Sequence, residues 1–131
     1  ELSDLSRINL TDEKDQIMNK IKKAKTDPMP MPVTTEELNK RPEAKNLIGI
    51  YSSLTGFTLE KTIKEYSGKN FSEFKENLSQ VLVDKINPIS IEIKKLLNEK
   101  NYLDKILLEG CEKADIIASK KIKKIHEIVG F

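Results

Sequence analysis

Residues 109–125 read "EGCEKADIIASKKIKKI" and consist almost entirely of small, aliphatic and lysine residues. At 100° of rotation per residue, most apolar positions between 103 and 129 fall within about 60° of Ala114. The pattern therefore predicts an α-helix with one continuous apolar face. We expect a neighbouring helix to approach this face closely, and Cys111 to be a small core residue. The small residues of the face are Gly110, Cys111, Ala114 and Ala118.

The lysines of this helix are not spread evenly around it. Lys113, Lys120 and Lys124 form one row beside the apolar face, spaced i, i+7 and i+11. The row is either a solvated helix edge, favoured by the dipole of the helix C-terminus, or a surface that binds an acidic partner. Lys121 falls within the apolar stripe, where we expect its stem to pack and its ammonium to reach solvent.

Apolar residues recur with helical spacing along the rest of the 131 residues, and only 5% of residues are aromatic. This favours an all-α fold, an irregular helical bundle with an aliphatic core. We expect one helical domain over 1–131, with 1–10 as a connector from a missing catalytic domain and 11–131 as the bundle. Three prolines at 28–32 predict an extended connector. The expected helices span about 12–25, 42–54, 59–66, 72–97 and 101–129.

Several helix ends carry recognisable signals. Thr11, Thr58, Ser72 and Asn101 stand where an N-capping side chain is expected. Pro88 should break or kink the helix that contains it, because proline removes a hydrogen-bond donor and crowds the preceding turn.

Composition excludes several functional classes. The net charge is only +2, so any basic surface must arise from clustering. His126 and Cys111 are the only residues of their types, which excludes histidine-based triads and multi-histidine metal sites. There is no glycine-rich phosphate loop and no apolar run long enough to cross a membrane. We therefore predict no catalytic, cofactor-binding or metal-binding residues in this chain, and a cytoplasmic location.

Four stretches together resemble bacterial tryptophanyl-tRNA synthetases. "SRINLTDEKDQIMNKIKKAKTD" is similar to the segment after the family's lysine-rich signature loop, and "AKNLIGIYSSLTG" to its asparagine-leucine helix. Two further stretches match the family's last two long helices. Two positions depart from the family pattern, since Cys111 replaces a usual alanine and Lys121 a frequent threonine. The matching ranges are 6–27, 44–56, 68–89 and 107–131.

The resemblance implies the C-terminal part of a class I aminoacyl-tRNA synthetase, beginning just after the signature loop. The parent enzyme would be a cytoplasmic homodimer that activates tryptophan with ATP and transfers it to tRNA. The ATP site would lie upstream, so the fragment alone should not catalyse, and we expect it to be monomeric or weakly associated. The family's helical C-terminal domain binds the anticodon end of tRNA and moves with respect to the catalytic domain.

Two functional hypotheses follow. In the first, Lys113, Lys120 and Lys124 contact tRNA phosphates. In the second, the chain is a helical module that docks onto protein, for example onto its own catalytic domain, without binding RNA. Salt separates the two, because phosphate contacts weaken steeply as salt rises and docking of an aliphatic face does not. An independent enzyme is poorly supported by one histidine, one cysteine and scattered carboxylates.

Overall fold

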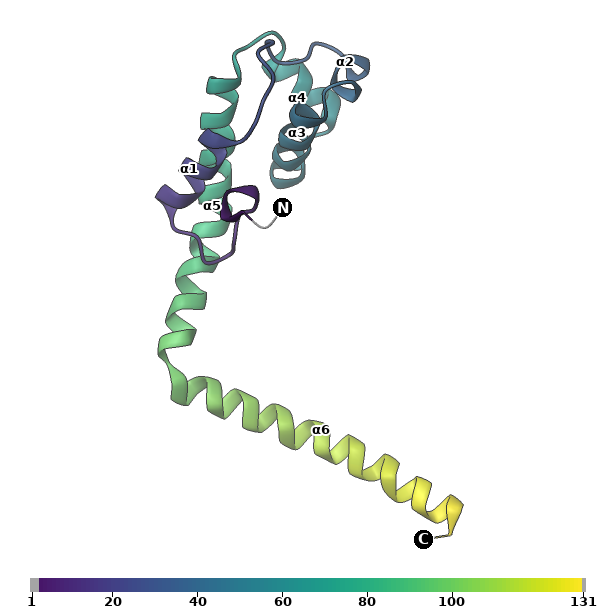
Figure 1. Cartoon of the computed structure of the whole chain (residues 1–131). Coiled ribbons are helices and arrows are strands. Elements are labelled where there is room, and N and C mark those ends of the chain that lie inside the picture. The colour runs from purple at the N-terminus through teal and green to yellow at the C-terminus, as the bar shows by residue number, and fades with distance from the viewer. Residues whose placement is uncertain (1–2, 131) are drawn as a thin grey trace. The chain divides into compact units, whose positions relative to one another are not determined.

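A computed structural model of the chain describes residues 3–130. These residues form six α-helices and one short 3-10 helix, with no β-strand among them, which confirms the predicted all-α class (Figure 1). The chain divides into two compact units, one ending at Ile91 and the other beginning at Glu92. The single domain over 1–131 stays a prediction, and residues 1–2 of the expected connector lie outside the described residues. The elements are η1 (Asp4–Ser6), α1 (Lys14–Lys23), α2 (Thr35–Asn39), α3 (Pro42–Thr55), α4 (Leu59–Tyr66), α5 (Phe71–Asn98) and α6 (Lys100–Val129).

The first unit is built around apolar side chains from α1 to α5. Within it, α2, α3 and α4 pack against one another, as Figure 1 shows. An aromatic cluster lies in this core, where the rings of Tyr51, Tyr66 and Phe74 meet in pairs with centroids 4.9 to 5.6 Å apart. The Tyr66 hydroxyl donates a hydrogen bond to the Tyr51 hydroxyl at 3.0 Å, so burying these phenols leaves neither polar group unsatisfied. Other fully or nearly fully buried residues are Ile17, Met31, Leu38, Ala44, Ile48 and Leu78.

The proline-rich connector between α1 and α2 is tied to the first unit by its backbone. The Met31 amide donates to the Lys69 carbonyl at 2.9 Å, and the Gly68 amide donates back to the Met31 carbonyl at 3.2 Å. Gly68 has φ of +70°, a left-handed conformation that favours glycine. The prolines thus keep the segment extended, while Met31 is anchored in the core.

The helix ends agree only partly with the predicted caps. Thr58 is confirmed, since its Oγ1 accepts a hydrogen bond from the Lys61 amide at 3.2 Å. Ser72 and Asn101 are wrong, because α5 begins at Phe71 and α6 at Lys100. Thr11 is also wrong, since α1 begins two residues later than expected, after a capping box between Glu13 and Gln16.

Helix α1 begins later than expected because the side chain of Asp12 is engaged by other residues. Its carboxylate accepts hydrogen bonds from the Asn9 amide at 2.9 Å and from the Lys20 ammonium at 2.7 Å. Lys20 also pairs with Asp4 at 3.0 Å. The Asp12 side chain therefore closes a tertiary ion pair and a local turn, and Glu13 becomes the cap.

This ion pair predicts a loss of stability in acid. Burial favours a higher pKa for Asp12, but the hydrogen bonds from Lys20 and Asn9 outweigh it, and the pKa is lowered. The hydrogen bond from Lys20 lowers the pKa of Asp4 as well. At pH values below about 4 the unfolded chain therefore binds more protons than the folded one, so stability must fall as pH falls.

We expect the urea midpoint to decrease between pH 6 and pH 3, and to decrease less in Asp12→Asn, which lacks the titrating group. Urea unfolding of both proteins, followed by far-ultraviolet circular dichroism, checks this. Equal pH dependence in the two proteins would contradict it.

Two further features differ from the sequence expectations. Residues Thr35–Asn39 form a short helix that was not predicted, capped by the Thr34 hydroxyl, which accepts from the Glu37 amide at 3.2 Å. Of the two outcomes expected at Pro88, a break is excluded, because α5 is assigned as one helix through that position. A long helix can lose the one hydrogen bond that proline removes when its neighbouring turns are intact.

Candidate nucleic-acid interface

Helix α6 carries the residues that the sequence singled out, and none of its residues is buried. On its apolar side Leu107 is 69% exposed and Ile117 71% exposed. Cys111 is exposed as well, so the prediction that it is a small core residue is wrong. The helical period identifies an apolar face that requires a partner, but it does not say whether the partner belongs to the same chain.

The basic residues of α6 are concentrated in its second half. No aspartate or glutamate occurs between Ile116 and His126, although Asp115 and Glu127 flank this segment. The lysines of the segment line one surface groove of about 570 Å³. The residues lining this groove are Ile117, Lys120, Lys121, Lys123, Lys124 and Glu127.

The structure brings together two of the three predicted lysines. Lys120 and Lys124 both line the α6 groove, whereas Lys113 lies on the same helix outside it. All three are exposed. Neither a hydrogen bond nor an ion pair engages their side chains within residues 3–130. The row proposed from spacing is therefore free to bind an anion, and its C-terminal half is the more concentrated part.

Sequence reasoning missed Lys123 and assigned Lys121 to the apolar stripe. A helical wheel follows Cα directions only, and the long lysine stem can carry its ammonium well away from that direction. Lys121 is exposed and lines the same groove as its neighbours. The signal that identifies all four residues is the acid-free segment itself, because four lysines with a carboxylate only at its flanks raise the local positive potential.

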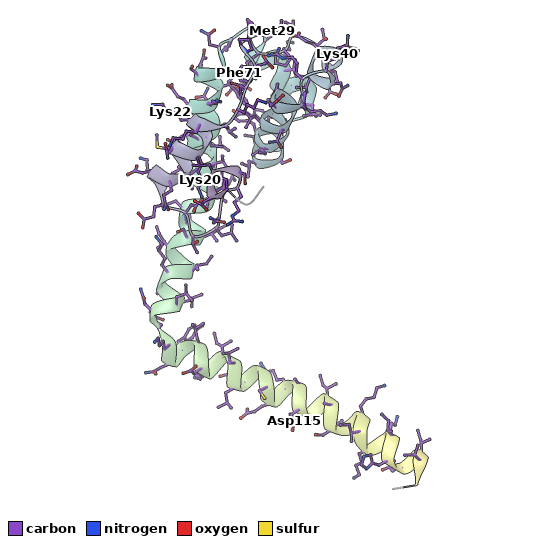
Figure 2. All side chains as sticks on the ribbon, in the orientation of Figure 1. Lys20, Lys22, Met29, Lys40, Phe71 and Asp115 are labelled. Atoms are coloured by element: carbon purple, nitrogen blue, oxygen red, sulfur yellow. The ribbon has the colours of Figure 1, made fainter. Side chains whose placement is uncertain are left out.

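A second groove lies in the first unit, between α1 and the start of α5. It has a volume of about 700 Å³, and Lys22 and Phe71, both labelled in Figure 2, line it from the two helices. The Lys75 ammonium donates to the carbonyl oxygens of Ala24 at 2.6 Å and Lys22 at 3.4 Å. Burial lowers the pKa of Lys75. Lys75 thus satisfies carbonyl groups at the C-terminal end of α1, where intrahelical donors are lacking.

Neither groove resembles a catalytic centre. Among residues 3–130 no group of three or more histidine, cysteine or acidic side chains is arranged to hold a metal ion. No helix in the described part of the chain is long and apolar enough to cross a membrane. The side chains that line the two grooves are ammonium groups, apolar groups, uncharged polar groups and one carboxylate in each, Glu127 on α6 and Glu76 on α5.

Comparison with known proteins gives a consistent result. The chain is 45% identical over 98% of its length to the tryptophan–tRNA ligase of Agrobacterium fabrum. It is 45% identical over its whole length to that of Rickettsia felis, and 44% identical over 98% to that of Caulobacter vibrioides. The chain is homologous to part of the bacterial tryptophan–tRNA ligases. No protein-family model matches it.

The homology covers only part of each ligase. The chain spans 36% of the Agrobacterium fabrum ligase, 38% of the Caulobacter vibrioides ligase and 39% of the Rickettsia felis ligase. The tryptophan–tRNA ligases therefore contain a further portion of roughly 60% of their length that this chain does not match.

Proposed function

We propose that this chain is the helical tRNA-binding part of a tryptophan–tRNA ligase, and that α6 contacts tRNA phosphates. The observation that carries the proposal is the acid-free lysine segment of α6 in a chain homologous to these ligases over nearly its whole length. Ammonium groups that have no protein partner can neutralise phosphates and release the counterions condensed on RNA. Phosphate contacts set affinity and orientation, and they carry no sequence information.

In this proposal Lys113, Lys120 and Lys124 contact successive phosphates along one edge of α6, and Lys121 and Lys123 widen the basic surface. The activation of tryptophan with ATP is assigned to the portion of the ligase outside the matched region. The chain by itself supplies binding and not chemistry.

Replacement of Lys113, Lys120 and Lys124 by alanine tests this assignment. The tRNA affinity of the chain should decrease, and the slope of log affinity against log salt should become shallower by about 2 to 3, because each phosphate contact contributes about 0.7 to 0.9. Fluorescence anisotropy with a tryptophan tRNA transcript of Rickettsia felis, at several salt concentrations, measures both quantities.

The matched control replaces Lys40, Lys85 and Lys105, three exposed lysines outside the row, and so changes the net charge equally. It should alter the slope much less. Equal slopes for the two triple variants would show that total charge, and not this row, governs binding.

Docking onto protein is the second candidate function, and the exposed apolar side of α6 favours it. Ile128 is 81% exposed, and Leu5 and Leu10 near the N-terminus are about half exposed. We propose that these surfaces pack against the remaining portion of the ligase, and that the whole ligase is a cytoplasmic homodimer. Apolar burial responds weakly to salt, whereas phosphate contacts weaken steeply as salt rises. If the chain stays associated with its partner at high salt, it docks onto protein. If it dissociates at high salt, it binds RNA.

A further inference from the structure

We propose that Lys75 is an acylation site, at which an acyl phosphate bound in the groove between α1 and the start of α5 modifies the side-chain amine. An acyl phosphate is a mixed anhydride of a carboxylic acid and phosphate, either free or as an adenylate. The proposal does not depend on RNA binding, since Lys75 belongs to the first unit and the lysines of α6 to the second. Such a reaction requires an uncharged amine, room for the reagent and a cation beside its phosphate.

The amine of Lys75 is bound by carbonyl groups and by no carboxylate. It donates to the Ala24 carbonyl at 2.6 Å and to the Lys22 carbonyl at 3.4 Å, and within residues 3–130 it has no further hydrogen bond and no ion pair. The side chain is partly buried, and burial lowers the pKa of Lys75. Deprotonation leaves two N–H donors, one for each carbonyl oxygen, and frees a lone pair. The geometry therefore tolerates the uncharged, nucleophilic form of the amine.

Lys69, just before α5, shows the opposite situation. Its ammonium lies 2.8 Å from the Glu73 carboxylate, and this hydrogen bond raises the pKa of Lys69. Because the carboxylate favours the charged form, a smaller fraction of Lys69 is uncharged at a given pH. Lys75 should thus react first, although Lys69 is the more exposed of the two.

The groove offers room and suitable walls for the reagent. It has the volume of a typical small-ligand site, and Met18 and Phe71 line it with apolar groups that suit a short acyl chain. Lys22 also lines the groove, and its exposed side chain has no partner within residues 3–130. An ammonium at this position can bind the phosphate of the reagent, and it offsets the charge of Glu76 in the same groove.

The proposed reaction is a nucleophilic acyl substitution. Lys75 Nζ attacks the acyl carbon, a C–N bond forms, and the bond from that carbon to the phosphate oxygen breaks. The phosphate leaves with the electron pair, Lys22 stabilises its charge, and the nitrogen releases one proton to solvent. Nothing is oxidised or reduced. The product is a neutral amide with a single N–H, so one of the two carbonyl groups bound by Lys75 loses its donor.

Treatment of the 131-residue chain with acetyl phosphate, and separately with acetyl adenylate, tests the proposal at neutral pH. Peptide mass spectrometry after cleavage at acidic residues measures the acetylated fraction of each lysine over time. In the folded chain Lys75 should react at least about threefold faster than Lys69. In concentrated urea the two rates should become similar, because the unfolded chain has neither the burial nor the ion pair. The reagent that gives the larger preference identifies the source.

The pH dependence of the two rates supplies an independent readout. An amine stops gaining reactivity once the pH exceeds its pKa. Since the pKa of Lys75 is lowered and that of Lys69 is raised, the rate at Lys75 should level off at the lower pH. The charged groups that line the groove beside Lys75 are Lys22 on α1 and Glu76 on α5.

Replacement of Lys22 by glutamine tests the cation in the groove. The Lys22 carbonyl remains, so the contact with Lys75 is kept while the phosphate loses its partner. Acetylation of Lys75 by acetyl phosphate should fall about threefold, whereas acetylation by p-nitrophenyl acetate, an uncharged ester, should not change. The matched control is Lys23→Gln, an exposed position that does not line the groove, and it should alter neither rate. Circular dichroism must show that both variants are folded.

Three results would overturn the proposal. Equal rates at Lys75 and Lys69 in the folded chain would show that burial does not activate the amine. A preference for Lys75 that persists in urea would show that local sequence, and not the fold, determines reactivity. Equal effects of Lys22→Gln and Lys23→Gln would show that the groove does not bind the phosphate of the reagent.

Discussion

Replacement of Phe74 by alanine is expected to lower the free energy of unfolding by about 3 to 5 kcal/mol, the largest effect of any single substitution considered. The side chain is fully buried. Its ring lies 4.9 Å from that of Tyr66 and 5.6 Å from that of Tyr51, centroid to centroid. Truncation therefore removes buried apolar area and two aromatic contacts at once, and it leaves a cavity beside two phenols.

The phenols make this position especially sensitive. Burial and the hydrogen bond with Tyr66 raise the pKa of Tyr51, which shows how poorly this site would tolerate a charge. If the cavity admits water, the hydrogen bond between the two hydroxyl groups has a competitor, and the geometry of the cluster relaxes. We therefore expect Phe74→Ala to reduce the near-ultraviolet circular dichroism of tyrosine as well as the stability.

Urea unfolding followed by far-ultraviolet circular dichroism measures the change. Phe74→Leu keeps most of the apolar volume and should cost clearly less than Phe74→Ala. The matched control is Phe57→Ala, because the Phe57 ring is only partly buried and faces the Lys61 ammonium at 3.5 Å. If Phe57→Ala is as damaging as Phe74→Ala, the aromatic cluster is not the centre of the core.

The position of Phe74 in the core illustrates what could be predicted from sequence. The helical period over 74–86 places Phe74, Leu78 and Leu82 on one face, and all three are buried. The same reasoning gave α3 and α4 to within about one residue. Periodicity succeeds here because the residues that cover these faces lie within the same unit.

The same reasoning was wrong where a local signal competes with a tertiary contact. Thr11 is an acceptable cap in isolation, but the pairing of Asp12 with Lys20, eight residues away, fixes the turn and moves the helix start to Lys14. Cys111 occupies an apolar face in sequence and is exposed in the structure. The capping signal does not reveal that Lys20 engages Asp12, and the apolar period does not reveal what covers Cys111, so a local pattern decides neither case.

The candidate binding surfaces show a related limit. Lys113, Lys120 and Lys124 could be proposed from sequence because they lie on one edge of one helix. The groove between α1 and α5 could not, since Asn19 and Glu76 are 57 positions apart and no spacing rule brings them together. Grooves formed by two helices depend on how the helices pack, and packing is decided by the whole core.

Arg41 is the residue whose loss should be most damaging outside the aliphatic core. It is 8% exposed and holds the segment before α2 to the start of α3. Its Nε donates to Asp27 Oδ2 at 2.9 Å and its Nη2 to Asp27 Oδ1 at 2.6 Å. Nη1 donates to Glu37 Oε1 at 2.9 Å, and the guanidinium lies 5.6 Å from the centre of the Phe71 ring.

Substitution of Arg41 by methionine should therefore cost about 2 to 3 kcal/mol. The hydrogen bond from Arg41 lowers the pKa of Asp27, so the variant leaves a partly buried carboxylate without its cation. The folded pKa of Asp27 should rise toward or above its unfolded value. The native chain loses the stability contributed by the pair of Arg41 and Asp27 as pH falls below about 4. The variant should lack this contribution already at neutral pH.

Arg41→Lys separates charge from geometry. Lysine supplies a cation but not the planar fork that binds both oxygens of Asp27. Arg41→Lys should therefore lose most of the stability that Arg41→Met loses. The matched control is Lys25→Met. Lys25 also pairs with a carboxylate, that of Glu43 at 3.4 Å, but its side chain is largely exposed. Its replacement should therefore change the stability little. Urea titrations at pH 7 and pH 3.5 measure all three variants. If Arg41→Lys is as stable as the native chain, charge alone secures this connector, and the bidentate geometry is incidental to it.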